Sequence, residues 1–64
     1  MFKYSALIKE YGIAHVQKPQ FSINRELSIE ELRDVFSVNE PYVQYYEIYQ
    51  ENENGIEIKI DFSY

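Results

Sequence analysis

Apolar and polar residues alternate most regularly at the end of the chain. Ile56, Ile58, Ile60, Phe62 and Tyr64 are separated by Glu57, Lys59, Asp61 and Ser63. A period of two is typical of a half-buried strand. Residues 45–49 show the same alternation, and residues 52–55 between the two segments read Asn-Glu-Asn-Gly, which is typical of a turn. The pattern therefore predicts a C-terminal β-hairpin.

The apolar residues of this hairpin also select its register. A two-residue loop at Asn54-Gly55 would place Ile48 opposite Asp61 and bring charge into the core. A three-residue loop over residues 53–55 places Ile48 opposite Ile60 and collects the apolar side chains on one face. We expect this second register, with Gly55 in the left-handed position of a turn that carries a bulge. The residues expected to face one core are Tyr46, Ile48, Ile60 and Phe62.

A helix is predicted in the middle of the chain. Ser28 is a good N-cap, and Glu31 three residues later completes a capping box. Apolar residues then recur at helical spacing and form the expected buried stripe, which consists of Ile29, Leu32, Val35 and Phe36. The helix should end near Val38, because Pro41 disfavours helical geometry at the residue before it.

The first third of the chain admits two structures. Alternation over residues 2–8 predicts a strand, whereas good helix formers over residues 4–11 also allow a helix. Tyr11-Gly12 predicts a turn, after which residues 13–16 could return as a second strand. Residues 21–23 add a short extended segment before the helix.

These elements predict one domain over residues 1–64, because a chain of 64 residues has room for no more. The order is strand, strand, helix, strand, strand, which gives an α+β class. A helix packed on one face of a small mixed sheet would bury both apolar surfaces. This order matches a small β-grasp-like domain.

Composition and charge narrow the functions. A net charge of −5 disfavours phosphate backbones and anionic membranes as direct partners, and it suits a protein partner with a basic surface. No apolar run approaches a membrane span, and the N-terminus lacks the order of a signal peptide. The absence of cysteine favours a reducing compartment, so we expect a cytoplasmic protein.

Chemistry-bearing residues are few. His15 is the single histidine and has no carboxylate or nucleophile near it in the sequence. Gly12 and Gly55 are the only glycines, so no phosphate-binding loop can be built. We therefore expect no enzyme activity, no cofactor and no metal site.

One feature does indicate function, and it lies on the outward side of the hairpin. In the expected register Glu47 faces Asp61 and Glu51 faces Glu57, which are repulsive pairs. Tyrosines, which are enriched at binding hot spots, flank them. The predicted protein-binding site comprises Tyr45, Glu47, Tyr49, Glu51, Glu57, Lys59 and Asp61.

Residues 27–36, Leu-Ser-Ile-Glu-Glu-Leu-Arg-Asp-Val-Phe, resemble the helix of the bacterial ubiquitin-like proteins of PRTRC gene systems. In that family a Leu-Ser-x-Glu-Glu-Val-Arg-Asp-x-Tyr run precedes a proline and two strands, and Pro41 and residues 42–62 are similar in placement. The resemblance implies a β-grasp fold and an E1-like, ThiF-related partner. Because residues 61–64 read Asp-Phe-Ser-Tyr without a terminal glycine, we expect binding rather than conjugation.

Two functions follow from this reading. The first is a non-catalytic, ubiquitin-like module that docks through its acidic, tyrosine-rich sheet face. The alternative is a small phage-type acidic inhibitor, an anti-CRISPR-like DNA mimic, that blocks a nucleic-acid-binding groove on a host defence enzyme. Same-face residues along a strand repeat every ~6.8 Å, so in that case Glu57 and Asp61 would imitate a row of phosphates. An edge strand could also pair with that of a second copy to form a homodimer.

Overall fold

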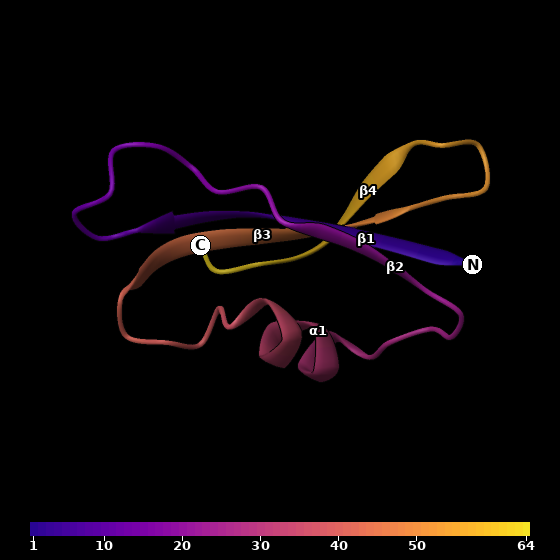
Figure 1. Ribbon diagram of the computed structural model, residues 1–64, viewed down its shortest axis with the longest axis horizontal. Coiled ribbons are helices and arrows are strands. Elements are labelled where there is room, and N and C mark those ends of the chain that lie inside the picture. Colours follow the sequence, from indigo (N-terminus) through magenta and orange to yellow (C-terminus); the bar gives the residue numbers. More distant parts are fainter.

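The computed structural model describes residues 1–64 as one four-stranded sheet with one helix. The strands are β1 (Phe2–Glu10), β2 (Gln20–Ile23), β3 (Val43–Glu51) and β4 (Glu57–Phe62), and the helix is α1 (Ile29–Phe36). The sheet order is β2-β1-β3-β4, and α1 lies against one face only (Figure 1). The predicted α+β class and order of elements are confirmed. No helix is both long and apolar enough to cross a membrane.

The sheet is antiparallel throughout, so the expected mixed sheet is wrong. β1 pairs antiparallel with both β2 and β3, and β3 pairs antiparallel with β4. β2 and β3 therefore run in the same direction on either side of β1. The connection that contains α1 leads from the end of β2 across β1 to the start of β3. β2 and β3 are thus parallel to each other, but β1 lies between them, so no neighbouring strands are parallel.

The first third is a strand and a loop rather than a helix or a tight hairpin. β1 fills residues 2–10, and Gly12 has the positive φ of 79° that the predicted turn requires. Residues 13–16 form no strand, contrary to expectation, and β2 begins only at Gln20. Phe21 and Ile23 both reach the helix-covered face there, opposite Tyr4 and Phe2, whereas residues 13–16 contain no aromatic ring for the core.

The core lies between α1 and the two central strands. Its nine buried residues come from β1, α1, β3 and the helix flanks: Tyr4, Ala6, Ile8, Leu27, Leu32, Phe36, Val38, Tyr46 and Ile48. The ring of Phe21 joins the layers, because it lies 5.7 Å from the ring of Tyr4 and 5.4 Å from that of Phe36. The buried hydroxyl of Tyr4 accepts the backbone N–H of Leu27 at 3.0 Å, which fixes the chain as it enters the helix.

The helix ends are as the sequence predicts. Ser28 and Glu31 form the reciprocal capping box, with bonds of 3.1 Å and 3.0 Å. Ser37 closes the helix in a left-handed conformation, and the Val38 N–H reaches back to the carbonyl of Arg33. Val35 is wrongly predicted to be buried, since its side chain is 55% exposed. It lies about 60° further round the helix than Leu32 and passes the edge of the core.

The β3–β4 hairpin follows the predicted register near its turn and departs from it beyond a bulge. Gly55 has a φ of 78°, Asn52 pairs with Ile56 by a 2.8 Å bond, and Gln50 faces Ile58 as expected. The register then shifts between Ile48 and Tyr49, and Ile60 is the extra residue on β4. Beyond this point Ile48 faces Asp61 and Glu47 faces Phe62, so the expected Ile48–Ile60, Tyr46–Phe62 and Glu47–Asp61 pairs are wrong.

Candidate functional site

The face of the sheet opposite α1, called the outer face below, carries no helix (Figure 1). Strand alternation places on it the odd-numbered side chains of β1 and β3, because their even-numbered neighbours are buried against α1. With the facing residues of β4 and the C-terminal segment, the outer face comprises Lys3, Ser5, Leu7, Lys9, Tyr45, Glu47, Tyr49, Glu51, Glu57, Lys59, Phe62 and Tyr64.

Six of the seven predicted site residues lie on the outer face, and Asp61 does not. The bulge at Ile60 turns Asp61 to the helix-covered side, where its side chain is only 13% exposed. Its carboxylate accepts bonds from Arg33 Nε at 2.9 Å, Arg33 Nη2 at 3.1 Å and the Tyr46 hydroxyl at 2.9 Å. The Arg33 guanidinium lowers the pKa of Asp61, so this carboxylate binds the helix to β4 and is not free to bind a partner.

Glu47 is satisfied within the outer face rather than repelled. It accepts hydrogen bonds from the Tyr49 hydroxyl and, at 3.1 Å, from Lys59 Nζ. The Tyr49 bond, followed by that of Lys59, lowers the pKa of Glu47, and the same bond raises the pKa of Tyr49 to about 12. Glu47 is therefore held ionised and oriented by two neighbours.

The second predicted repulsive pair is present. Glu51 faces Glu57 across β3 and β4. Glu51 is compensated by Lys3, whose Nζ lies 3.4 Å from its carboxylate. Glu57 is the one acidic side chain of the outer face that forms no ion pair.

An aromatic cluster that the sequence did not predict adjoins Glu47. The ring of Tyr64 packs edge-on against Tyr45 at 6.3 Å and beside Phe62 at 5.4 Å. Lys59 Nζ lies 5.7 Å from the Tyr64 ring and 5.8 Å from the Phe62 ring, which is cation–π geometry. Phe62 is 52% exposed and Tyr64 is 66% exposed. The two-residue-loop register, which was not the one predicted from the sequence, places Phe62 opposite Glu47. That register would have predicted Phe62 in this cluster.

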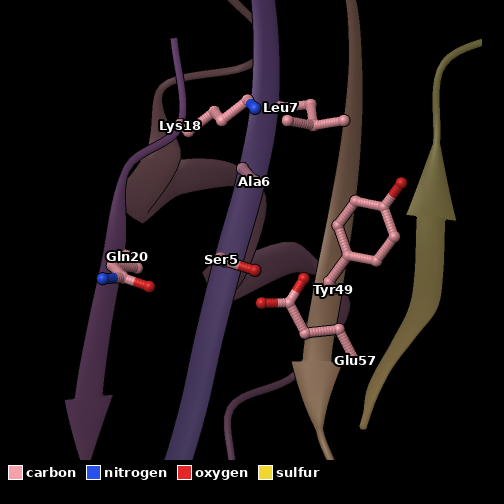
Figure 2. Close-up of a pocket in the computed structure, with 7 residues that line it drawn as sticks. All are labelled: Ser5, Ala6, Leu7, Lys18, Gln20, Tyr49 and Glu57. Atoms are coloured by element: carbon pink, nitrogen blue, oxygen red, sulfur yellow. The ribbon is translucent and has the colours of Figure 1, made fainter.

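Two open depressions indent the outer face. One, of about 500 Å³, lies over β1 between the loop before β2 and the start of β4, and it is lined by Ser5, Ala6, Leu7, Lys18, Gln20, Tyr49 and Glu57. The Glu57 carboxylate points across β3 toward β1 in this depression (Figure 2). The other, of about 440 Å³, is lined by Leu7, Tyr45, Glu47 and Tyr64. Apolar rings beside one fixed carboxylate can receive a long cationic side chain.

The charge of the molecule is distributed unevenly. Of its eleven acidic residues four form ion pairs, and of the seven others only Glu57 belongs to the outer face. Lys3, Lys9 and Lys59 of the outer face equal its three glutamates in number, and Asp61 lies on the other face, so the expected acidic strip is wrong. Four unpaired carboxylates lie on α1 or beside it in sequence: Glu26, Glu30, Asp34 and Glu40.

The remaining titratable groups form no reactive constellation. His15 is exposed in the loop between β1 and β2. No group of three or more His, Asp or Glu side chains is placed to hold a metal ion. Every buried side-chain nitrogen and oxygen has a hydrogen-bond partner.

The chain matches no protein-family model, no curated protein sequence and no solved structure. The resemblance of residues 27–36 to a ubiquitin-like helix therefore stays a prediction.

Proposed function

We propose that the chain is a non-catalytic protein-binding module that docks through its outer face onto a protein partner that inserts a basic side chain. The observation that carries the proposal is the cluster of Tyr45, Phe62 and Tyr64 beside the depression lined by Glu47. Exposed aromatic residues that gather at one place are typical of the centres of protein interfaces. A net charge of −5 opposes direct binding to nucleic acid or to anionic lipid.

The geometry of the smaller depression supports an arginine as the anchor that a partner inserts. Tyr45 and Tyr64 offer ring faces or edges, Leu7 offers an apolar floor, and Glu47 offers a carboxylate. A guanidinium stacks on aromatic rings, and to bond the Glu47 carboxylate it would take the place of Lys59 Nζ, which holds that carboxylate at 3.1 Å and is on a side chain that is 40% exposed. Glu47 is already ionised and held in place, so an incoming arginine would not have to orient it.

The acidic-inhibitor alternative is supported by a different surface. Glu57 and Asp61 lie on opposite faces and cannot form the row of phosphate mimics that the sequence suggested. The unpaired carboxylates Glu30 and Asp34, one helical turn apart, lie on α1 instead. An inhibitor that occupies a nucleic-acid groove would use this helix surface and would lose affinity steeply as salt increases.

A ubiquitin-like relationship adds one candidate partner, an E1-like protein, through the resemblance of residues 27–36. The β-grasp itself is not part of the proposal, because all three strand pairings are antiparallel. A cytoplasmic location fits the absence of cysteine.

The test compares tyrosines on and off the outer face. Wild-type chain, a Tyr45→Ser/Tyr64→Ser variant and a Tyr42→Ser control are used to capture proteins from extracts of the source cells. Tyr42 is 49% exposed but lies before β3 and lines neither depression. We expect a protein that binds wild type and the control and loses binding to the double variant by about 2 kcal/mol or more.

Titration of that protein at two ionic strengths then separates the two functions. Binding that persists in high salt and depends on the tyrosines supports the outer face. Binding that survives the tyrosine changes but is lost in high salt, or in a Glu30→Lys/Asp34→Lys variant, would overturn the proposal in favour of the acidic inhibitor.

A further inference from the structure

The outer edge of β4 is unpaired. The sheet order places β4 at one edge, with β3 as its single neighbour (Figure 1). An open edge offers backbone N–H and C=O groups to any strand that can match it. Ile56 and Ile58 at this edge are 56% and 47% exposed, although they lie on the helix-covered side of the sheet. The opposite edge, β2, is only four residues long and follows Pro19, so it offers less.

The backbone of β4 directs two residues toward this free edge. The N–H of Asn52 donates to the carbonyl of Ile56 at 2.8 Å, so Ile56 points its backbone groups toward β3. Hydrogen-bonded and non-bonded positions alternate along an antiparallel ladder. The backbone groups of Glu57 and Lys59 therefore point away from β3 and are the ones available to a new strand.

The regular part of this edge has a defined centre. Gly55 ends it on one side with a left-handed turn, and the bulge at Ile60 ends it on the other. The stretch between them covers residues 56–59 and holds the two outward-pointing residues, Glu57 and Lys59, with Ile58 midway between these two. An antiparallel two-fold pairing in which both Glu57 and Lys59 bond the new strand places Ile58 opposite Ile58 of a second copy, because the axis must pass midway between these two residues.

In this register the side chains match on both faces. Glu57 lies opposite Lys59 of the second copy, twice by symmetry, and the two residues exchange the outward-pointing backbone bonds. Ile56 lies opposite Ile60 of the second copy, which extends a ladder of isoleucines on the helix side. A shift of one residue would place isoleucine and charge on the same face. A shift of the axis to Glu57 or to Lys59 would place like charges opposite each other.

The unpaired charge of Glu57 supports the same register. Glu57 faces Glu51 within the chain and has no cation of its own. Lys59 of a second copy supplies one. Lys59 keeps its bond to Glu47 meanwhile, since an ammonium group has three donors.

We infer that the chain forms a two-fold homodimer by antiparallel pairing of β4 with β4 of a second copy, centred on Ile58. The pairing joins two four-stranded sheets edge to edge and leaves both outer faces uncovered. It goes beyond the proposed function and does not depend on it.

The first test uses charge reversal, with self-association measured by sedimentation equilibrium over a range of concentrations. Glu57→Lys and Lys59→Glu each turn both attractive pairs into repulsive ones, so each should raise the dimer dissociation constant about tenfold or more. An equimolar mixture of these two variants restores Glu–Lys pairs at both positions and should associate as wild type does. Glu40→Lys is the control, because it makes the same charge change in an exposed loop. Circular dichroism checks that each variant folds. If Lys59→Glu does not fold, a Glu57→Lys/Lys59→Glu double variant replaces the mixture, because it also restores opposite charges at both positions.

The second test uses the lack of cysteine in the chain. Ile58→Cys places two thiols opposite each other at a non-hydrogen-bonded pair, where a disulfide can form, and mild oxidation should give a covalent dimer. Ser22→Cys on the β2 edge should not. A wild-type chain that stays monomeric at millimolar concentration, a mixture that fails to recover, or cross-linking through Ser22→Cys in place of Ile58→Cys would each overturn the inference.

Discussion

The helix-covered face and the outer face of the sheet are built from alternate residues of the same strands, yet they are held together differently. On the covered face Tyr4, Leu32 and Ile48 are fully buried, and the one ion pair, Arg33 with Asp61, lies at its margin. On the outer face aromatic rings lie beside ion pairs, and Lys59 contacts the rings of Phe62 and Tyr64 as well as the Glu47 carboxylate. Burial of apolar side chains stabilises the covered face. The outer face is ordered by local contacts, which a partner can replace or extend.

A single residue decides which side chain belongs to which face. Ile60 is the extra residue of the β4 bulge, and it exchanges the positions of Asp61 and Phe62 relative to a regular strand. As a result the covered face gains a carboxylate that bonds α1, and the outer face gains an exposed ring. The difference between the two faces therefore depends on the bulge as well as on the sequence period.

The largest expected effect is on the covered face. Phe36→Ala removes a buried ring that packs 5.4 Å from the ring of Phe21 and should cost about 3–5 kcal/mol. A core of this size supplies about that much net stability, so the variant should be largely unfolded. Val35→Ala on the same helix is the control and should change stability by less than ~0.5 kcal/mol. Urea denaturation followed by circular dichroism measures both, and comparable losses would show that α1 presents a different face to the sheet.

A smaller effect is expected where the bulge joins the two faces. Asp61→Ala leaves the Tyr46 hydroxyl and the Arg33 guanidinium without their acceptor and should cost about 1–3 kcal/mol. The matched change on the outer face, Glu47→Ala, removes the acceptor of Lys59, whose side chain is 40% exposed and can be hydrated instead, and should cost less. The reverse ranking in thermal denaturation would mean that Asp61 lies on the outer face, as a strand without a bulge would place it.

Local signals in the sequence were sufficient for most of the fold. The capping box at Ser28, the turn at Gly55 and the alternation of β1 and β3 each involve neighbours within a few residues, and each is confirmed. Strand pairing is not local. Whether β1 pairs with residues 13–16 or with β2 depends on which segment brings aromatic rings to the core. Phe21 of β2 does so, because its ring packs against that of Phe36, which is far from it in the sequence.

The candidate site was harder to predict than the fold for the same reason. The register that pairs Ile48 with Asp61 was not predicted, because it places a charged residue next to the core. A charged residue is tolerated there where it has a partner, and Arg33 on α1 provides one at the margin of the core. The outer-face tyrosines were found because they lie on the regular part of β3, whereas Phe62 and Tyr64 follow the bulge and were not.

The ion pair of the covered face also predicts acid sensitivity. Arg33 lowers the pKa of Asp61 below its ordinary value of 3.8. A depressed folded-state pKa stabilises the protein above the unfolded value, and this contribution is lost as the pH falls through the folded value. Stability should therefore decline below about pH 4 in the wild type and decline less in Asp61→Asn. Asp34→Asn, at an exposed position without an ion pair, serves as the control in pH-dependent thermal denaturation. Equal acid sensitivity in Asp61→Asn and the wild type would contradict the prediction.

The smallest expected effect on stability is at alkaline pH, on the outer face. The bond to Glu47 raises the pKa of Tyr49 from its ordinary 10.0 to about 12, because a phenolate beside a carboxylate is disfavoured. A raised folded-state pKa stabilises the protein below the unfolded value and is lost as the pH rises through the folded one, here between pH 10 and about 12. Glu47→Gln removes the negative charge and should move the Tyr49 titration toward pH 10. The ultraviolet absorbance of phenolate follows this titration, and Tyr49→Phe assigns the signal. Tyr42→Phe is the control for an exposed tyrosine elsewhere in the chain. If the titration assigned to Tyr49 is the same in Glu47→Gln, then Glu47 is not held by Tyr49, and the outer face would have to be ordered by Lys59 and the aromatic cluster alone.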